Sequence, residues 1–315
     1  MPAEAQIEIG QARISGFDVG AFEETREEFL QRLADRETQL RAKPDQAGGN
    51  QNLESVRELR TGNGIVGKMF VHSRTVTEGT RANGLELERY RDEGVAVEAL
   101  VHGAGVSIDL SAEYYDPVQI EELPALVAQL VPNPDNKLTG KAGFCLGSAY
   151  IRDPLTAEQG EQITMFGAIP RHPDVQFMLT LSAGLKPDAQ GLLERSEESN
   201  SKLFFWQRMR ISELRAAPRE IAGLPGEELV ESFTEHNGAR VHSFWWEVNG
   251  TEDNVLIPHF MFRMDTGKSN NGPVPSSLSE HSALGLWDRI LSSIRLQASA
   301  QPLRSIGART PSTVK

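Results

Sequence analysis

Hydrophobic positions repeat at helical spacing near the start of the chain. From Asp18 onward, apolar side chains recur every three or four residues with charged residues mostly between them, which predicts an amphipathic helix of about 20 residues. Its apolar stripe consists of Phe22, Phe29, Leu30, Leu33 and Leu40. A segment rich in Gly, Asn and Gln, residues 43–52, follows as a loop.

The period then changes to two. Apolar and polar residues alternate in four short stretches, which predicts antiparallel strands. The stretches are residues 69–74, 85–88, 95–97 and 106–111. Three predicted turns, each ending in Gly, fall at residues 82–84, 92–94 and 103–105. Asp116 and Pro117 then supply the N-cap and first residue of a second helix that runs to about Leu130, with a break at Pro124.

Residues 131–137 are rich in Pro and Asn and give the best candidate for a domain boundary. Past it, further alternating or apolar runs predict more strands and one short helix. The strands are residues 144–151, 163–169, 175–182, 231–235, 240–248 and 255–264, and the short helix is residues 188–195. Asn237-Gly238 and Asn249-Gly250 are strong hairpin signals among the last three strands.

A closing helix begins after Ser279, which is a favoured N-cap residue. Its apolar stripe consists of Leu284, Trp287, Ile290, Leu291 and Ile294. The sequence therefore predicts an α+β protein of two domains, each a mainly antiparallel sheet with a few packed helices. The predicted domains are residues 1–137 and 138–298, followed by a flexible tail, residues 299–315.

Composition and charge exclude several classes of protein. The single cysteine, Cys145, rules out an intrachain disulfide, and no apolar run reaches the roughly 18 residues of a membrane span. The formal charge is −12, and residues 1–137 carry 24 acidic and 14 basic side chains, which is −10 of that total. This acidic surface disfavours binding to nucleic acid or insertion into a membrane and favours a basic protein partner. A solvated surface that only aids solubility is the alternative.

No motif assembles a catalytic, cofactor or metal site. Gly267-Lys268-Ser269 has Phe262 where a phosphate-binding loop needs Gly, and Ser182 lacks the first Gly of a nucleophile elbow. Cys145 lies between Phe144 and Leu146 in an apolar run, which favours a buried, unreactive thiol over a nucleophile.

The histidines and aromatic residues give weaker indications. His236 and His242 span the Asn-Gly turn with no carboxylate at ligand spacing, so a metal site there is disfavoured. Phe205-Trp206 and residues 244–246 (Phe-Trp-Trp) are candidates for a partner-binding platform. Because strand faces alternate, core positions for at least one residue of each group are the favoured interpretation.

The order of several stretches in the second half resembles the C-terminal domain of the cognate immunity proteins of type VI secretion lipase effectors, specifically those paired with the fourth class of phospholipase effectors. The stretches are residues 142–146, 171–177, 192–195, 214–215, 221–228, 244–247, 266–267, 286–288 and 292–295. The first half is similar to that family more loosely, through residues 36–40. The family's export leader and opening strand are not recognised here, so we expect a chain that begins just inside the mature domain.

The resemblance implies a periplasmic antitoxin of bacterial competition. Such a protein binds its phospholipase effector, one to one, and clamps the active-site and lid region. The resemblance supplies no catalytic residue, metal or cofactor. Two other functions stay open: a hydrolase of unrecognised type that uses Cys145, and a structural envelope or secretion-accessory protein.

Three polar loops are the predicted partner-binding segments: residues 78–84, 197–201 and 268–275. The candidate contact residues are Glu78, Arg81, Asn83, Glu197, Glu198, Asn200, Asn270 and Asn271. The alternative for each loop is a solvated turn.

Overall fold

The structure is a computed structural model that describes residues 4–44, 51–84, 86–135, 143–152, 160–184, 186–252 and 257–295. The strands of its first half are β1 (Gln6–Ile14), β2 (Phe17–Glu23), β3 (Leu53–Arg60), β4 (Val66–Asn83), β5 (Glu86–Gly103) and β6 (Val106–Tyr115). Those of its second half are β10 (Glu161–Ile169), β11 (His172–Ala183), β12 (Ile211–Ile221), β13 (Leu224–Thr234), β14 (Arg240–Val248) and β15 (His259–Asp265). A small separate sheet consists of β7 (Leu130–Pro132), β8 (Gly143–Cys145) and β9 (Ala149–Arg152).

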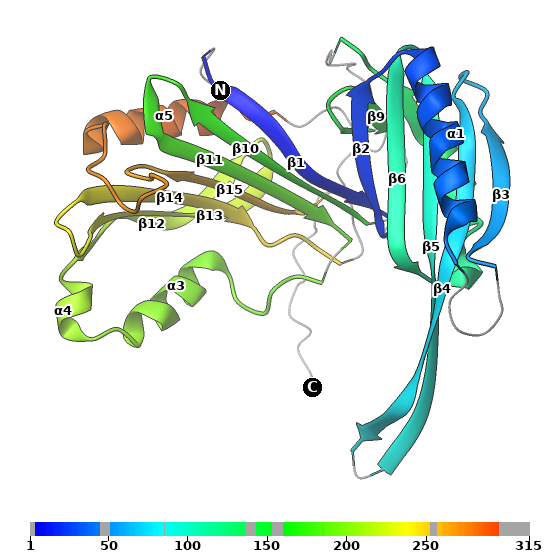
Figure 1. The fold of residues 1–315 in the computed structure, drawn as a ribbon. Coiled ribbons are helices and arrows are strands. Elements are labelled where there is room, and N and C mark those ends of the chain that lie inside the picture. Colours follow the sequence, from blue (N-terminus) through cyan, green and yellow to red (C-terminus); the bar gives the residue numbers. More distant parts are fainter. Residues whose placement is uncertain are drawn as a thin grey trace, which may run out of the picture.

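Five α-helices accompany the strands in the described ranges. They are α1 (Arg26–Ala42), α2 (Glu122–Gln129), α3 (Leu192–Ser201), α4 (Phe205–Arg208) and α5 (Glu280–Ser293), and a 3₁₀ turn lies at Pro117–Gln119. The α+β class is therefore confirmed (Figure 1). None of the helices in these ranges has the length and apolar character needed to cross a membrane.

The twelve longer strands share one hydrogen-bonded order, β12-β13-β14-β15-β11-β10-β1-β2-β6-β5-β4-β3. Strand β1 joins the two halves, because it pairs antiparallel with β10 along its length and with β2 at its end. The packing also crosses the predicted boundary, since Ile151 and Ile163 lie in the core of the first half. The division into residues 1–137 and 138–298 stays a prediction.

Both faces of the first-half sheet are covered. On one face α1 packs Phe29, Leu33 and Leu40 against Phe70 and Leu100. The other core contains residues of the sheet, of α2 and of the small sheet, among them Phe17, Val97, Ile108, Leu123 and Ile151. Strand β5 is accordingly buried at nearly every position from Gly94 to its end, as expected for a strand covered on both sides.

The second-half core lies under α5. The Trp287 ring stacks on Phe262 with centroids 5.4 Å apart and is tilted against Phe244. Its indole N–H donates to the buried carboxylate of Glu228 at 2.6 Å. The predicted capping by Ser279 is confirmed, because its hydroxyl accepts a hydrogen bond from the backbone of Ser282. Of the predicted stripe, Trp287, Ile290 and Leu291 are buried.

The first predicted helix was wrong at its start. Ser15 and Gly16 take positive φ angles that turn the chain into a hairpin, so Phe17–Glu23 forms β2. The helix begins only after Thr25, where the Thr25 hydroxyl and the Glu28 carboxylate form a reciprocal capping box.

Several other boundaries differ from the predictions. The predicted turn at 92–94 lies inside β5, where a side chain on Gly94 would collide with the ring of Tyr114. The strand predicted over 144–151 is two short strands, β8 and β9. The helix predicted over 188–195 begins at Leu192 instead. Strands β1, β3, β7 and β12 were not predicted, and β1 is the opening strand that was not recognised in the sequence. Residues 136–142, residues 253–256 and the predicted tail, residues 299–315, lie outside the described ranges.

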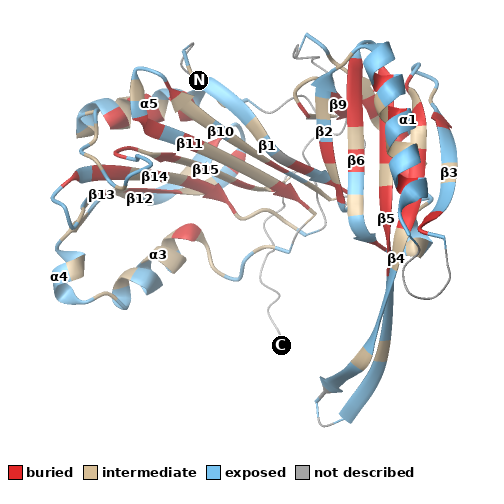
Figure 2. Cartoon of the chain, viewed as in Figure 1, coloured by how far each residue is buried: buried red, intermediate tan, exposed pale blue. Residues whose placement is uncertain are grey.

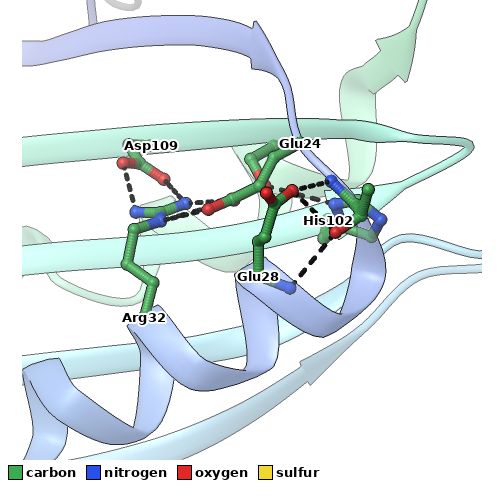
Figure 3. Close-up of polar contacts among 7 residues, drawn as sticks. Glu24, Glu28, Arg32, His102 and Asp109 are labelled. Carbon is green, nitrogen blue, oxygen red and sulfur yellow. Dashed lines mark hydrogen bonds and ion pairs between the residues drawn. The ribbon is translucent and has the colours of Figure 1, made fainter.

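Two arginines fasten α1 to the sheet. Arg32 bridges Glu24 and Asp109, and the close-up in Figure 3 shows this bridge beside His102 and Glu28. One turn further on, Arg36 forms a bidentate ion pair with Glu98, which also contacts Nε2 of His72 at 3.0 Å. Burial alone would raise the pKa of Glu98, but the hydrogen bonds from Arg36 and His72 outweigh it and lower the pKa to about 2.

Replacing Glu98 with Gln tests this anchor. A pKa lowered in the folded state from 4.5 to about 2 means that the carboxylate stabilises the fold above about pH 4.5 and loses that contribution as the pH falls toward 2. We expect Glu98→Gln to reduce the free energy of unfolding by about 3 kcal/mol at pH 7 and by less at pH 3. Urea unfolding at both pH values measures this, with the exposed Glu86→Gln as control. A loss that is the same at both pH values contradicts the assignment.

Candidate partner-binding surface

The β4–β5 hairpin projects beyond the sheet as a two-stranded arm, residues 75–94. Its neighbours end at its base, because β3 stops opposite His72 and β6 stops opposite Val95. A bulge at the base, with Ser73 at a φ of 51°, marks where the arm leaves the sheet. Nine residues per strand give an arm of about 30 Å, which is the long projection at the bottom of Figure 1.

The arm is exposed on both faces. From residue 75 to 93, every described side chain is exposed except Tyr90, and Gly79 opposite it is half-buried (Figure 2). The Tyr90 ring lies over Gly79, where any side chain would collide with it. Cross-strand ion pairs link Arg91 to Glu78 at 3.1 Å and Arg81 to Glu88 at 3.5 Å. Exposed pairs of this kind stabilise by at most about 1 kcal/mol each, so the arm contributes little to the stability of the fold.

A second projection, α3 and α4, leaves the other half of the sheet. Its first end is fastened by Arg195, whose guanidinium donates to both oxygens of the buried Glu247 carboxylate at 2.6 and 2.7 Å. Its far end returns to the sheet at Arg210, whose backbone carbonyl accepts from Thr234 and whose side chain contacts Nδ1 of His236. The segment between these points is held at both ends.

Helix α4 presents large apolar side chains to solvent. Phe204, Phe205, Trp206 and Met209 are 70, 78, 53 and 72% exposed, and we call these four residues the α4 cluster. The prediction that Phe205 or Trp206 lies in the core was wrong, because a single helical turn at the end of a projection has no sheet face over it. The same prediction is confirmed for residues 244–246, where Phe244 and Trp246 are fully buried.

The loop between β15 and α5 is the third exposed segment. The Asp174 carboxylate holds its two ends by accepting from the backbone of Gly267 at 2.9 Å and of Ser277 at 3.0 Å. Asn270 and Asn271 between them are exposed. Asn237, in the β13–β14 turn, donates to the Pro273 carbonyl, so this loop lies beside that turn. The Arg210 side chain contacts His236 in the same turn.

The predicted contact residues therefore lie on three separate elements. Glu78, Arg81 and Asn83 belong to the arm, and Asn270 and Asn271 to the β15–α5 loop. Glu197, Glu198 and Asn200 lie on α3, which is a helix and not the predicted loop. In Figure 1, α3 lies below the second-half sheet, the β15–α5 loop lies at the left end of that sheet, and the arm leaves the first half. Their role in binding stays a prediction.

The closest approach to a catalytic arrangement is Ser107 with His102 and Glu24. The Ser107 hydroxyl lies 3.2 Å from Nδ1 of His102 and donates to the Glu24 carboxylate. In a catalytic triad the carboxylate binds the histidine and the serine is accessible, whereas here Glu24 binds the serine, which has no exposed surface. Burial lowers the pKa of His102, and these groups instead connect β2, β5 and β6 beneath α1.

Other candidates for chemistry are also scattered. Cys145 is half-buried in β8 and not buried as predicted. Ser182 is buried in β11. Within the described ranges, no three His, Cys, Asp or Glu side chains are grouped so that they could hold a metal ion.

Comparison with known proteins gives one family match. A model described as the Tle cognate immunity protein 4 C-terminal domain matches residues 139–299, just over half of the chain. No curated protein sequence matches significantly.

Solved structures are similar over nearly the whole chain. The apo structure of immunity protein TplEi of the T6SS from Pseudomonas aeruginosa is 22% identical, with 95% of this chain and 94% of that chain covered and a TM-score of 0.73. The structure of TplEi complexed with "L" peptide is 21% identical, with 94% of each chain covered and a TM-score of 0.71. A chain of the Tle4–Tli4 complex is 23% identical, with 95% and 94% covered and a TM-score of 0.73. At these identities the likeness establishes the shared fold.

The exposure of the arm predicts that it can be removed without loss of the fold. Val76 and Glu93 are cross-strand partners, so residues 77–92 can be replaced by Asn-Gly, which favours a two-residue hairpin turn. We expect the midpoint of thermal unfolding to stay within about 3 °C of the parent, because no core side chain is lost. Circular dichroism melting measures this, and a fall of more than about 10 °C contradicts it.

Proposed function

Since the chain belongs to the Tle cognate immunity protein 4 family, we propose that it binds and inhibits a cognate phospholipase effector of a type VI secretion system. The family match over residues 139–299 carries this proposal, and it confirms the resemblance noted in the sequence. The structures of similar fold support the same role, because they are of the immunity protein TplEi and of a complex between Tle4 and Tli4.

The arrangement of the projections supports a clamp as the mode of inhibition. The arm extends from the first half and α3–α4 from the second half, and both lie toward the bottom of the view in Figure 1. An inhibitor that contacts an enzyme from two directions can cover both sides of an active-site cleft and its lid. We infer that the effector is bound one to one in this way, with its lid held closed.

Charge supports rapid capture of the effector. The first half carries −10 of the formal charge of −12, and the arm itself, residues 75–94, has five acidic and three basic side chains. An acidic surface accelerates encounter with a basic partner and repels anionic lipid. The expected partner surface is therefore basic near the arm.

We also propose a periplasmic location and a role without catalysis. A phospholipase delivered by a neighbouring cell acts on membrane lipid, so its inhibitor is needed in the compartment from which that lipid is reached. The arrangement of Ser107, His102 and Glu24 supports a structural role for these side chains. A structural envelope or secretion-accessory protein, by contrast, would not inhibit a lipase.

Inhibition is tested with the cognate phospholipase effector. We expect the two proteins to co-purify and an excess of this chain to abolish hydrolysis of phospholipid vesicles. The arm-shortened variant should inhibit at least about 100-fold less well, because a clamp that loses one side loses contact area and speed of capture. A lipase that stays fully active in excess protein contradicts the proposed function.

Replacing Cys145 with Ala separates the inhibitor from a cysteine hydrolase. Cys145 lies in β8 of the small sheet and belongs to none of the three exposed segments, so we expect Cys145→Ala to inhibit the lipase as well as the parent does. Titration of lipase activity with each protein gives the comparison, and Cys145→Ser serves as a matched control. Loss of an intrinsic hydrolytic activity in both variants would favour the enzyme.

A further inference from the structure

The α4 cluster is an unusual concentration of exposed apolar surface. Of the twelve large apolar side chains that are exposed in the described ranges, four lie within the six residues from 204 to 209. Scattered apolar residues are normal on a protein surface, but a contiguous group marks a place where another molecule binds. All four side chains are more than half exposed, and α4 is drawn mainly in the colour of exposed residues in Figure 2.

Local contacts support the backbone of α4 and two of the rings of the cluster. The Gln207 side chain accepts from the backbone of Phe204 at 3.0 Å, and Arg208 donates to the Asn200 carbonyl at 2.8 Å. The rings of Phe204 and Trp206 are stacked, and the Arg210 guanidinium lies 5.9 Å from the Trp206 ring centre. Side chains that are already ordered lose little conformational entropy on binding, which is typical of the residues that dominate interface affinity.

The charges beside the cluster select the kind of partner. A hollow of about 380 Å³ next to α4 is lined by three carboxylates, Glu197, Glu213 and Glu231, against one cation, Arg208. Glu213 and Glu231 lie directly opposite each other on β12 and β13. Like charges in that position repel, and burial, together with the charge of Glu213, raises the pKa of Glu231. A basic side chain in the hollow would relieve this repulsion, whereas a lipid phosphate would increase it.

We propose that the α4 cluster is the main anchor for the effector, and that it packs against an apolar segment of that protein bordered by a Lys or Arg that enters the acidic hollow. This assignment rests on the proposed function and names the residues and the partner chemistry that the function itself leaves open. It places the larger share of the affinity in α4 of the second half. The acidic arm then contributes the second side of the clamp and the speed of capture.

The test uses the full chain and the cognate phospholipase effector. The double variant Phe205→Ser/Trp206→Ser should raise the dissociation constant at least about 100-fold. It removes two anchor side chains, and the loss of each should raise the dissociation constant about tenfold or more. Its thermal midpoint should be unchanged, since both side chains are exposed in the free chain. Val118→Ser, which removes an 87% exposed apolar side chain from the first half, is the matched control and should bind like the parent.

A second variant tests the charge of the partner. Glu213→Gln keeps the shape of an exposed side chain, and we expect it to weaken binding about fivefold at low salt and less at high salt. Sedimentation with vesicles of phosphatidylethanolamine and phosphatidylglycerol, three to one, tests the membrane as the partner. If the parent chain sediments with the vesicles and the double variant does not, the proposal is overturned in favour of lipid docking.

The outcomes distinguish this proposal from the proposed function. If the parent chain does not bind the lipase, the proposed function fails and the anchor fails with it. If the parent binds and the double variant binds within threefold of it, the lipase is the partner but the α4 cluster is not its anchor. If Glu213→Gln binds at low salt as tightly as the parent does, the proposed Lys or Arg of the effector does not enter the acidic hollow.

Discussion

The ladder between β1 and β10 is the contact that holds the two halves of the chain in one sheet. Strand β1 pairs with β10 from Gln6 to Ile14 and with β2 over its last three residues, so it belongs to both halves at once. A bulge between Ile9 and Ala12 allows the strand to turn between them. Because backbone hydrogen bonds fix the register of this strand, they also fix how the half that carries the arm is joined to the half that carries α3–α4.

Buried or half-buried carboxylates fasten the peripheral elements onto that sheet. Glu98 receives Arg36 of α1, Glu247 receives Arg195 of α3, and Glu228 receives the indole of Trp287 in α5. Asp174 holds the β15–α5 loop through backbone amides. Each of these contacts joins residues far apart in the chain, and removing Arg36 or Arg195 would leave the carboxylate of Glu98 or Glu247 without its arginine partner. Arg195 and Asp174 fix where two of the exposed segments, α3–α4 and the β15–α5 loop, leave the sheet.

The surfaces proposed for recognition and the cores that hold the fold consist of different residues. The arm and the α4 cluster contribute almost nothing to the three cores, so their side chains can change without loss of the fold. That separation suits a protein that must match one effector and reject others, since specificity is a difference between affinities. Aromatic anchors supply affinity, and the acidic first half supplies attraction over a longer range.

Local sequence determined those elements in which the pattern of apolar residues indicates the buried face. The stripe of α5, the alternation in β14 and the Asn237-Gly238 turn were read correctly because period and turn chemistry are local properties. Tertiary structure decided the rest. Alternation does not say which strand is the partner, so the sequence missed that β1 joins the halves and that residues 92–94 continue β5. It predicted Phe205 or Trp206 in the core because the faces of a strand alternate. Both residues instead belong to helix α4 and are exposed, since burial depends on what the fold places over a side chain.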